Sequence, residues 1–194
     1  MRTRNHRRAR PGISVLSAAL VLCLLLSGCL HVTIIKTDDT APHFGLDVVK
    51  EINPDGSLGK SKTFTGDGFT ITLTDLFREQ MSEYGFDAYY NSPFCGVIVL
   101  KEPFTLKEGM EDETLLEYVE NVIKNNGHDT QPQEKDGLVY YRYSNPDPEY
   151  DFQGCSFSYK GSDAFYIFQF IYLETDAEEL EDTIFSYAKS VTVE

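Results

Sequence analysis

The sequence predicts an α+β protein with a largely antiparallel sheet flanked by helices, arranged as a three-layer α/β/α sandwich. Strand-like segments follow one another in hairpins and a meander, which is typical of antiparallel sheets. Amphipathic helices stand between and after these groups of strands. Residues 164–173 (AFYIFQFIYL) are apolar on both faces, and only Gln169 breaks the run. Such a strand is expected at the centre of a sheet that is covered on both sides.

Before that strand, the first half of the chain predicts a hairpin, a further strand and a short helix. Residues 46–52 and 58–64 flank a strong turn signal, NPDG, and are expected to pair as strands. After a second turn at residues 66–68, Phe69, Ile71 and Leu73 alternate with threonines, which predicts a half-buried strand. Residues 75–83 show helical spacing and are expected to form a short helix.

The second half of the chain is more strongly patterned. Residues 86–91 and 95–101 predict a strand pair across a Ser-Pro turn. Residues 115–123 carry the best helical periodicity, which ends at an Asn-Asn-Gly sequence. A meander of 138–144, 152–160 and 164–173 follows. The chain then predicts a helix that begins with a capping box at 175–178 and a closing strand at 191–193.

This order of elements resembles the PsbP-like and Ran-binding Mog-like family. The resemblance covers about residues 60–193 and is carried by four segments, GDGFTITL, TLLEYVENVIKNNG, AFYIFQFIYL and SVTV. It implies the three-layer sandwich. It also implies a docking or accessory role on a larger assembly, although fold alone does not determine function.

The N-terminal sequence predicts that the protein is exported from the cytoplasm. Five arginines lie in the first ten residues, and an apolar run follows at 13–26, as in a secretory signal. The run ends in Leu26-Ser27-Gly28-Cys29, which resembles the lipobox of bacterial lipoproteins. The resemblance implies removal of residues 1–28 and attachment of lipid, diacylglyceryl and palmitate, to Cys29. Apolar residues continue to position 35, so an uncleaved signal anchor is the alternative.

Three segments are therefore expected. Residues 1–28 are a lipoprotein signal peptide, 29–45 the lipidated N-terminus with a short tether, and 46–194 a single α+β domain. Both interpretations of the N-terminus place this domain on the extracytoplasmic face of the cell membrane. The lipid anchor is the expected membrane contact.

The excess of acidic residues argues against one class of partner, nucleic acid. The 194 residues include 17 Lys+Arg and 31 Asp+Glu, which gives a formal net charge of −14. Binding to nucleic acid requires clustered Lys and Arg, so no nucleic-acid partner is expected. A protein or a component of the cell envelope is the expected partner.

Catalytic signatures are missing from the sequence. It contains no G-x-S-x-G, P-loop, H-E-x-x-H or C-x-x-C motif, and neither enzymatic activity nor a cofactor is expected. A thiol enzyme would need Cys95 or Cys155 beside a base, for which His128 is the best candidate. Simpler interpretations of the two cysteines are a disulfide formed outside the cytoplasm or two buried free thiols.

Two further groups are candidate sites. Tyr89, Tyr141, Tyr143 and Tyr150 either form an exposed binding surface or are ordinary strand aromatics, and alternation puts Tyr141 and Tyr143 on one face with Tyr140 on the other. The second group is a weak Ca²⁺ candidate, for which a solvated acidic turn is the alternative. Its members are Asp147, Glu149 and Asp151.

The sequence thus predicts a non-catalytic accessory or binding lipoprotein that docks a protein or cell-envelope partner. The alternatives are a lipoprotein that binds a small ligand or cation and, less favoured, a small hydrolase. A deep apolar pocket would favour the ligand-binding alternative, whereas a filled core would favour docking.

Overall fold

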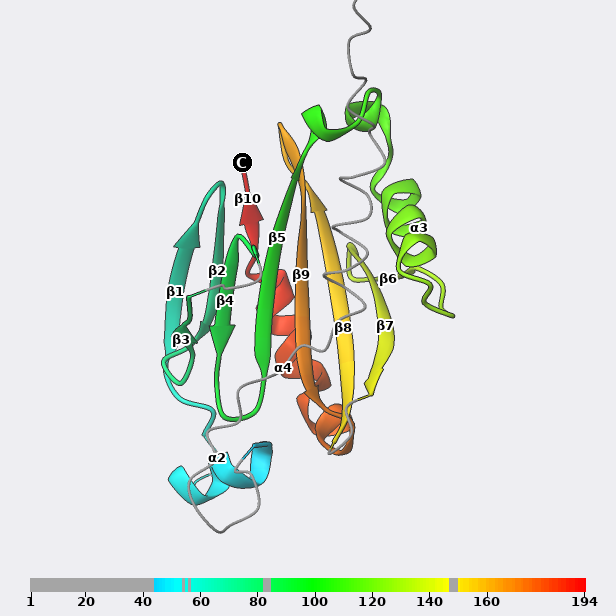
Figure 1. Ribbon diagram of the computed structural model, residues 1–194. Coiled ribbons are helices and arrows are strands. Elements are labelled where there is room, and N and C mark those ends of the chain that lie inside the picture. Colours follow the sequence, from blue (N-terminus) through cyan, green and yellow to red (C-terminus); the bar gives the residue numbers. More distant parts are fainter. Residues whose placement is uncertain (1–43, 54, 56, 82–84, 147–149) are drawn as a thin grey trace, which may run out of the picture.

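The computed structural model describes residues 44–194, except 54, 56, 82–84 and 147–149 (Figure 1). In this part of the chain, seven strands form one antiparallel sheet in the order β3-β4-β5-β9-β8-β7-β6. Their bounds are β3 (Arg78–Glu79), β4 (Ala88–Asn91), β5 (Gly96–Pro103), β6 (Gln133–Lys135), β7 (Leu138–Pro146), β8 (Asp151–Lys160) and β9 (Ala164–Leu173).

Strand β9 occupies the middle of this sheet, as its sequence predicts. It pairs with β8 from Phe165 to Leu173 on one side and with β5 from Ala164 to Ile171 on the other. Every residue from Ala164 to Tyr172 is buried, including Gln169 at 3% exposure. A strand without a solvent face must have cover on both sides, so β9 determines the layering of the fold.

A smaller antiparallel sheet of three strands has the order β1-β2-β10, with bounds β1 (Ser61–Gly66), β2 (Phe69–Thr74) and β10 (Thr192–Val193). In β2, Phe69, Ile71 and Leu73 are buried, while the first two intervening threonines are half-buried. The predicted alternation and the predicted closing strand are both confirmed. Gly68, with φ of 76°, supplies the left-handed backbone of the turn between β1 and β2.

Helix α3 (Leu115–Asn125) confirms the strongest helical prediction. Thr114 accepts a hydrogen bond from the backbone N–H of Glu117, and Glu117 accepts one from Thr114 N–H, which is a reciprocal capping box. Gly127, with φ of 67°, follows the helix end. Two 3₁₀ turns, η1 (Phe104–Leu106) and η2 (Met110–Asp112), lead from β5 to α3.

Helix α4 (Ala177–Lys189) follows the 3₁₀ turn η3 (Glu174–Asp176). The helix was predicted correctly, but its capping box was not. The side chain of its N-cap residue, Asp176, makes no cap hydrogen bond and instead accepts one of 2.8 Å from the backbone N–H of Leu46. A carboxylate at the start of one helix therefore satisfies a free donor of another.

The predicted hairpin of residues 46–52 with 58–64 is wrong. Residues Leu46–Ile52 form helix α2, in which Leu46 and Val49 are 4% and 1% exposed. This spacing of three buries one side of a helical turn and leaves Asp47 and Lys50 toward solvent. Strand β1 begins later, at Ser61, and pairs with β2.

The predicted helix at 75–83 is also wrong as far as the structure describes this segment. Phe77 is fully buried against the rings of Phe94 and Tyr187, and Arg78 and Glu79 form the edge strand β3. Met81, at 94% exposure, lies on no buried helix face. The apparent helical spacing of residues 75–83 therefore has another origin. It comes from the buried ring of Phe77 and from the pairing of Arg78 and Glu79 with β4.

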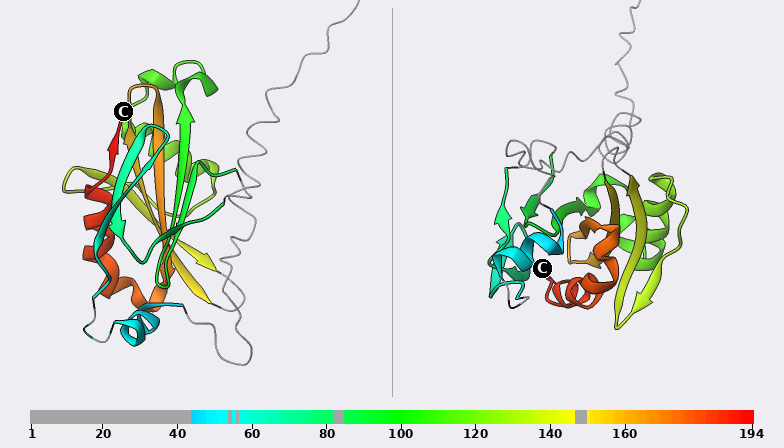
Figure 2. Two further views of the ribbon diagram at one scale, coloured as in Figure 1. Left: turned by 90° about the vertical axis from the view of Figure 1, so that its left-hand side faces the viewer. Right: turned by 90° about the horizontal axis from the view of Figure 1, so that it is seen from below.

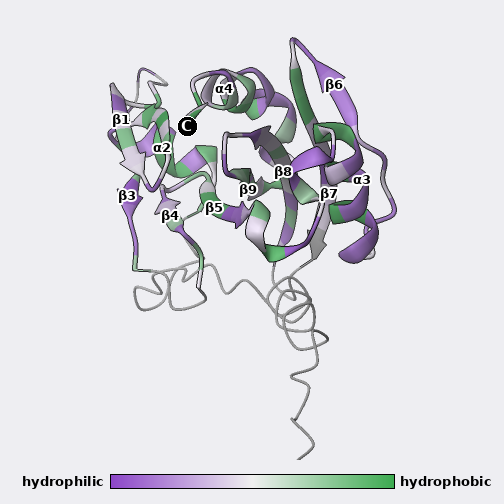
Figure 3. Ribbon diagram, turned by 90° about the horizontal axis from the view of Figure 1, so that it is seen from above, coloured by the Kyte–Doolittle hydropathy of each residue, from purple (hydrophilic) through white to green (hydrophobic). Residues whose placement is uncertain are grey.

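The layers can be followed in two views. Helix α4 and the small sheet lie on one face of the large sheet, and α3 lies on the other (Figures 2 and 3). The main core fills the space between the large sheet, the small sheet and α4. The predicted fold class, an α+β sandwich with an antiparallel sheet flanked by helices, is confirmed.

Candidate functional site

The candidate site lies on the face of the large sheet that carries α3, here called the α3 face. Strand register defines which side chains share this face, because alternate residues of each strand point the same way. One row crosses five strands in the order β4, β5, β9, β8 and β7. It consists of Tyr89, Ile98, Gln169, Ser156 and Tyr141.

Helix α3 covers one half of this face. Val119 is fully buried, and Tyr118 stacks on Phe165 with ring centroids 3.9 Å apart and an 8° interplanar angle. The Tyr118 hydroxyl donates a 2.8 Å hydrogen bond to Glu102. Burial raises the pKa of the Glu102 carboxyl, an effect that this hydrogen bond partly offsets. This half is a conventional helix-on-sheet contact.

The other half, here called the aromatic half-face, is built differently. Its buried centre consists of Ile98, Phe152 and Ile171, at 1%, 5% and 2% exposure. The apolar residues packed around that centre come from strands and the segments beside them, and among the described residues none belongs to a helix. They are Phe44, Phe86, Tyr89, Leu100, Tyr150 and Leu173.

Two glycines shape the row that contains Ile171. Gly96 on β5 and Gly154 on β8 are its register neighbours on either side. The ring of Tyr143 occupies the place where a side chain on Gly154 would lie, and the ring of Tyr89 leans toward Gly96. Because glycine has no side chain, Tyr143 on β7 and Tyr89 on β4 extend over Gly154 and Gly96 toward the middle of the sheet.

The structure brings the four predicted tyrosines to this face. Tyr143 is half-buried, stacks on His128 at 4.5 Å and donates a 3.4 Å hydrogen bond to Gln169. Tyr89 and Tyr150 are half-buried within the aromatic half-face, and the Tyr150 ring lies 6.0 Å from that of Phe152. Burial raises the pKa of Tyr89, which therefore stays a neutral hydrogen-bonding group.

Tyr141 is a correction to the predicted binding surface. It is fully buried under α3, so it is a core residue and offers no contact area. The predicted alternation holds, because Tyr140 packs in the main core on the opposite face. Ile98, Ile171 and Gln169 were missed as site residues because β5 and β9 are apolar on both faces, so no pattern distinguishes one face from the other.

The two cysteines are buried free thiols on the opposite face, in the main core. Cys155 on β8 and Cys95, beside the start of β5, flank β9. Two interstrand spacings of about 4.8 Å separate such strands. This separation exceeds the limit of about 7 Å between bridged Cα atoms. The sheet therefore keeps both as thiols, so of the two alternatives that the sequence left open the structure shows two buried free thiols and no disulfide.

No thiol centre is assembled from these residues. His128 stacks on Tyr143 on the α3 face, whereas both cysteines point to the other side of the sheet. Burial raises the pKa of Cys155 to about 12 and raises that of Cys95 even further. Such thiols are poor nucleophiles at neutral pH, since the thiolate is the reactive form. Burial also lowers the pKa of His128.

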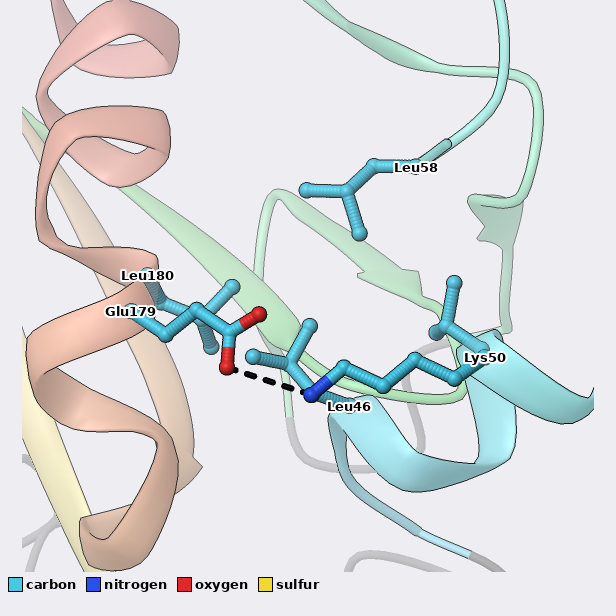
Figure 4. A pocket seen from close by; sticks show the side chains of 6 residues that line it. Leu46, Lys50, Leu58, Glu179 and Leu180 are labelled. Carbon is cyan, nitrogen blue, oxygen red and sulfur yellow. Dashed lines mark hydrogen bonds and ion pairs between the residues drawn. The ribbon is translucent and has the colours of Figure 1, made fainter. Parts of the chain in front are cut away.

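A small cavity lies between α2 and α4. Its lining includes Leu46, Leu58 and Leu180, and an ion pair of 3.2 Å between Lys50 and Glu179 spans it (Figure 4). Its volume of about 90 Å³ is well below the roughly 300 Å³ at which small-molecule pockets begin. It can hold a few water molecules rather than a substrate.

The Ca²⁺ candidate falls largely outside the described residues. Asp147 and Glu149 are not described, and Asp151 is exposed at the start of β8. Across the described part of the chain, histidines, cysteines and carboxylates form no group of three that could hold a metal ion. Cys29 and the whole signal segment also lie outside it. Within the described segments, no helix has the length and apolar character needed to cross a bilayer.

Comparison with known proteins finds no matching family model and no matching curated protein. Solved structures do match. A cyanobacterial PsbP from Synechocystis is 13% identical with a TM-score of 0.46, over 71% of this chain and 95% of that one. A Bacteroides thetaiotaomicron protein is 10% identical with a TM-score of 0.47, over 71% and 49% respectively.

A protein of unknown function from Pseudomonas aeruginosa is also similar, at 10% identity and a TM-score of 0.41, over 70% of this chain and 99% of that one.

Proposed function

We propose that this protein is a membrane-anchored, extracytoplasmic lipoprotein whose domain is non-catalytic and docks a protein partner. The observation that carries the proposal is the aromatic half-face. Half of the α3 face is sealed by a helix. In the other half, as far as the structure describes the chain, half-buried apolar and tyrosine side chains from strands and adjoining segments surround a buried apolar centre.

The chemistry of this surface suits protein recognition. Tyr89, Tyr143 and Tyr150 offer large rings with few rotatable bonds and a hydroxyl at the rim, a combination that is enriched at protein interfaces. Half-buried apolar residues around the apolar centre add contact area beside these rings. They are Phe44, Phe86, Leu100 and Leu173. The small cavity beside α2 does not offer a comparable site for a ligand.

The docking test is site-specific photo-crosslinking in cells. A photoreactive residue in place of Tyr89 is expected to capture one or two proteins. The same residue in place of Thr63, which is exposed on the small sheet, is the matched control. An unrelated domain on the same anchor provides a second control. If neither control differs from the Tyr89 position, docking through this face is contradicted.

The anchor has its own test. Intact mass of the detergent-extracted protein is expected to show loss of residues 1–28 and a diacylglyceryl adduct on Cys29. Two or three acyl chains hold a protein on a bilayer far more firmly than one. A full-length, unmodified mass would contradict lipidation and favour the uncleaved signal anchor.

A further inference from the structure

Strand β1 forms one edge of the small sheet, and on its outer side no other described strand pairs with it (Figures 1 and 3). Four of its six residues are exposed, and only Phe64 is buried. The edge strands of the large sheet, β3 and β6, contain two and three residues. The β1 edge is therefore longer, and a long edge offers a row of main-chain groups with which another strand can pair.

The hydrogen bonds of β2 show which main-chain groups of β1 face outward. The N–H and the carbonyl of Thr72 both bond to the hydroxyl of Ser190, which precedes β10 on the side away from β1. Because these groups alternate in direction along a strand, those of Ile71 face β1, where the register pairs this residue with Phe64. Every second residue of β1, counted from Phe64, therefore bonds to β2. The residues between them direct their N–H and carbonyl groups outward, and they are Ser61, Thr63 and Thr65.

These outward groups make the β1 edge complementary to a second copy of itself. In an antiparallel pair with Thr63 opposite the second copy's Thr63, each Ser61 lies opposite a Thr65. All three outward residues of each copy then find a hydrogen-bonding partner. A pair of this kind has two-fold symmetry, because both copies use the same surface.

Lys62 is the obstacle to this pairing. It lies on the inner side of β1 together with Phe64, and its ammonium nitrogen is 4.3 Å from the centroid of the Phe64 ring. In the pair described above, each Lys62 would lie opposite the second copy's Phe64, and the added strand would take the ammonium group out of water. Strand β1 contains no acidic residue to pair with it. Such a transfer is unfavourable, so an inward-facing charge on an edge strand opposes the addition of another strand.

We propose that the β1 edge is a self-association surface and that Lys62 prevents it from joining the small sheet of a second copy. The proposal concerns a different face from the aromatic half-face and does not depend on the docking function. It also implies that the edge at Thr63 is unoccupied in the wild type, as the crosslinking control above requires.

The test is thiol crosslinking of the full chain in native membranes. Thr63→Cys introduces a thiol on the outer side of β1, where the two opposed Cβ atoms of a β1 pair would lie about 5 Å apart. With Lys62 present, we expect a short bifunctional thiol reagent to give no more dimer than in the chain without this cysteine. Addition of Lys62→Val is expected to raise the dimer yield by about fivefold or more, because the charge beside Phe64 is gone. Lys62→Arg keeps the charge and should leave the yield at background.

Two controls establish that the crosslink arises from pairing of the edge. Thr72→Cys presents a thiol on the same side of the small sheet, since the hydroxyls of Thr63 and Thr72 lie 3.2 Å apart. In a β1 pair, three interstrand spacings, about 14 Å, would separate the two copies of this residue, so the short reagent should not join them. Thr65→Pro removes an outward N–H that β2 does not use. Added to Lys62→Val, it should return the dimer yield of the Thr63 cysteine to background.

Each outcome decides the proposal. Lys62→Thr is a second variant that removes the charge without adding a larger apolar side chain, and we expect a smaller rise in dimer yield from it. No rise in either variant overturns the proposal, and so does an equal yield in the chain that keeps Lys62. A crosslink that persists with Thr65→Pro, or that is equally strong from Thr72→Cys, would show association through another surface and would also overturn it.

Discussion

The two halves of the α3 face share the same strands and the same alternation, but they are closed in different ways. Under α3, Tyr118 and Phe165 stack face to face, and Tyr141 is sealed beneath them. Beyond the helix, Ile98 and Ile171 are surrounded by half-buried rings from strands and loops. One helix can thus divide a continuous sheet surface into a half that the helix seals and a half that strand and loop side chains close.

The largest expected effect comes from removing the helix-side stack. Tyr118→Ala removes the contact with Phe165 and the hydrogen bond to Glu102, and we expect it to lower the free energy of unfolding by about 3–5 kcal/mol. Tyr89→Ala in the aromatic half-face should cost about 1 kcal/mol because that ring is only half-buried. Urea unfolding followed by circular dichroism measures both. Equal losses would show that the two halves do not differ.

Substitution of Gly154 and Gly96 tests how closely the two tyrosine rings pack on the sheet. Gly154→Ala places a methyl group where the Tyr143 ring lies, and we expect a loss of about 1–3 kcal/mol from displacement of that ring. Gly96→Ala is the matched control. Its new methyl would lie 3.6 Å from the nearest atom of Tyr89, so a change within about 0.5 kcal/mol is expected. The reverse order of losses would refute this account of the two rings.

A smaller effect is expected from the hydrogen bond that joins the start of α2 to Asp176 at the start of α4. Asp176→Ala removes the acceptor for the backbone N–H of Leu46, and we expect a cost of about 1 kcal/mol. Amide hydrogen exchange should accelerate at Leu46 and Val49 while β9 stays protected. Asp182→Ala, on an exposed part of the same helix, is the control. Unchanged exchange in the Asp176 variant would mean that packing alone holds α2.

The smallest expected effect is a pH dependence. The folded-state pKa of Glu102 is raised by burial, so its contribution to stability is fully present below the unfolded-state pKa and is lost as pH rises through the folded-state pKa. Glu102→Gln keeps an acceptor for the Tyr118 hydroxyl without the charge. We expect this variant to lack the loss and to be slightly more stable at neutral pH. Parallel pH profiles of wild type and variant would contradict this assignment.

Sequence patterns predicted the parts of this fold that have strong local periodicity. Helix α3 and strands β7, β8 and β9 follow from spacing alone, and the doubly apolar run of β9 correctly indicated its central place. Helix α2 did not follow, because its first N–H is satisfied by Asp176, 130 positions away. The segment around Phe77 did not follow either, since one buried ring and an edge pairing imitate helical spacing.

The candidate site was predictable only in part. Alternation correctly put Tyr141 and Tyr143 on one face, but it carries no information about which residues α3 will cover. That depends on where the helix lies across the sheet, which is a tertiary property. The choice between a disulfide and two free thiols could not be made from the sequence for the same kind of reason, because cysteine number and compartment do not reveal that β9 lies between Cys95 and Cys155.

The central position of β9 has a consequence for the order in which the chain can fold. In the described part of the chain, strands β3 to β5 share no pairing with strands β6 to β8. There the two groups are joined in the sheet by β9 (Ala164–Leu173). During synthesis, the two groups therefore stay separate until nearly the last stretch of sequence has been made. Such distant pairing slows folding. If the chain is exported as proposed above, this delay would keep it unfolded for longer before it crosses the membrane.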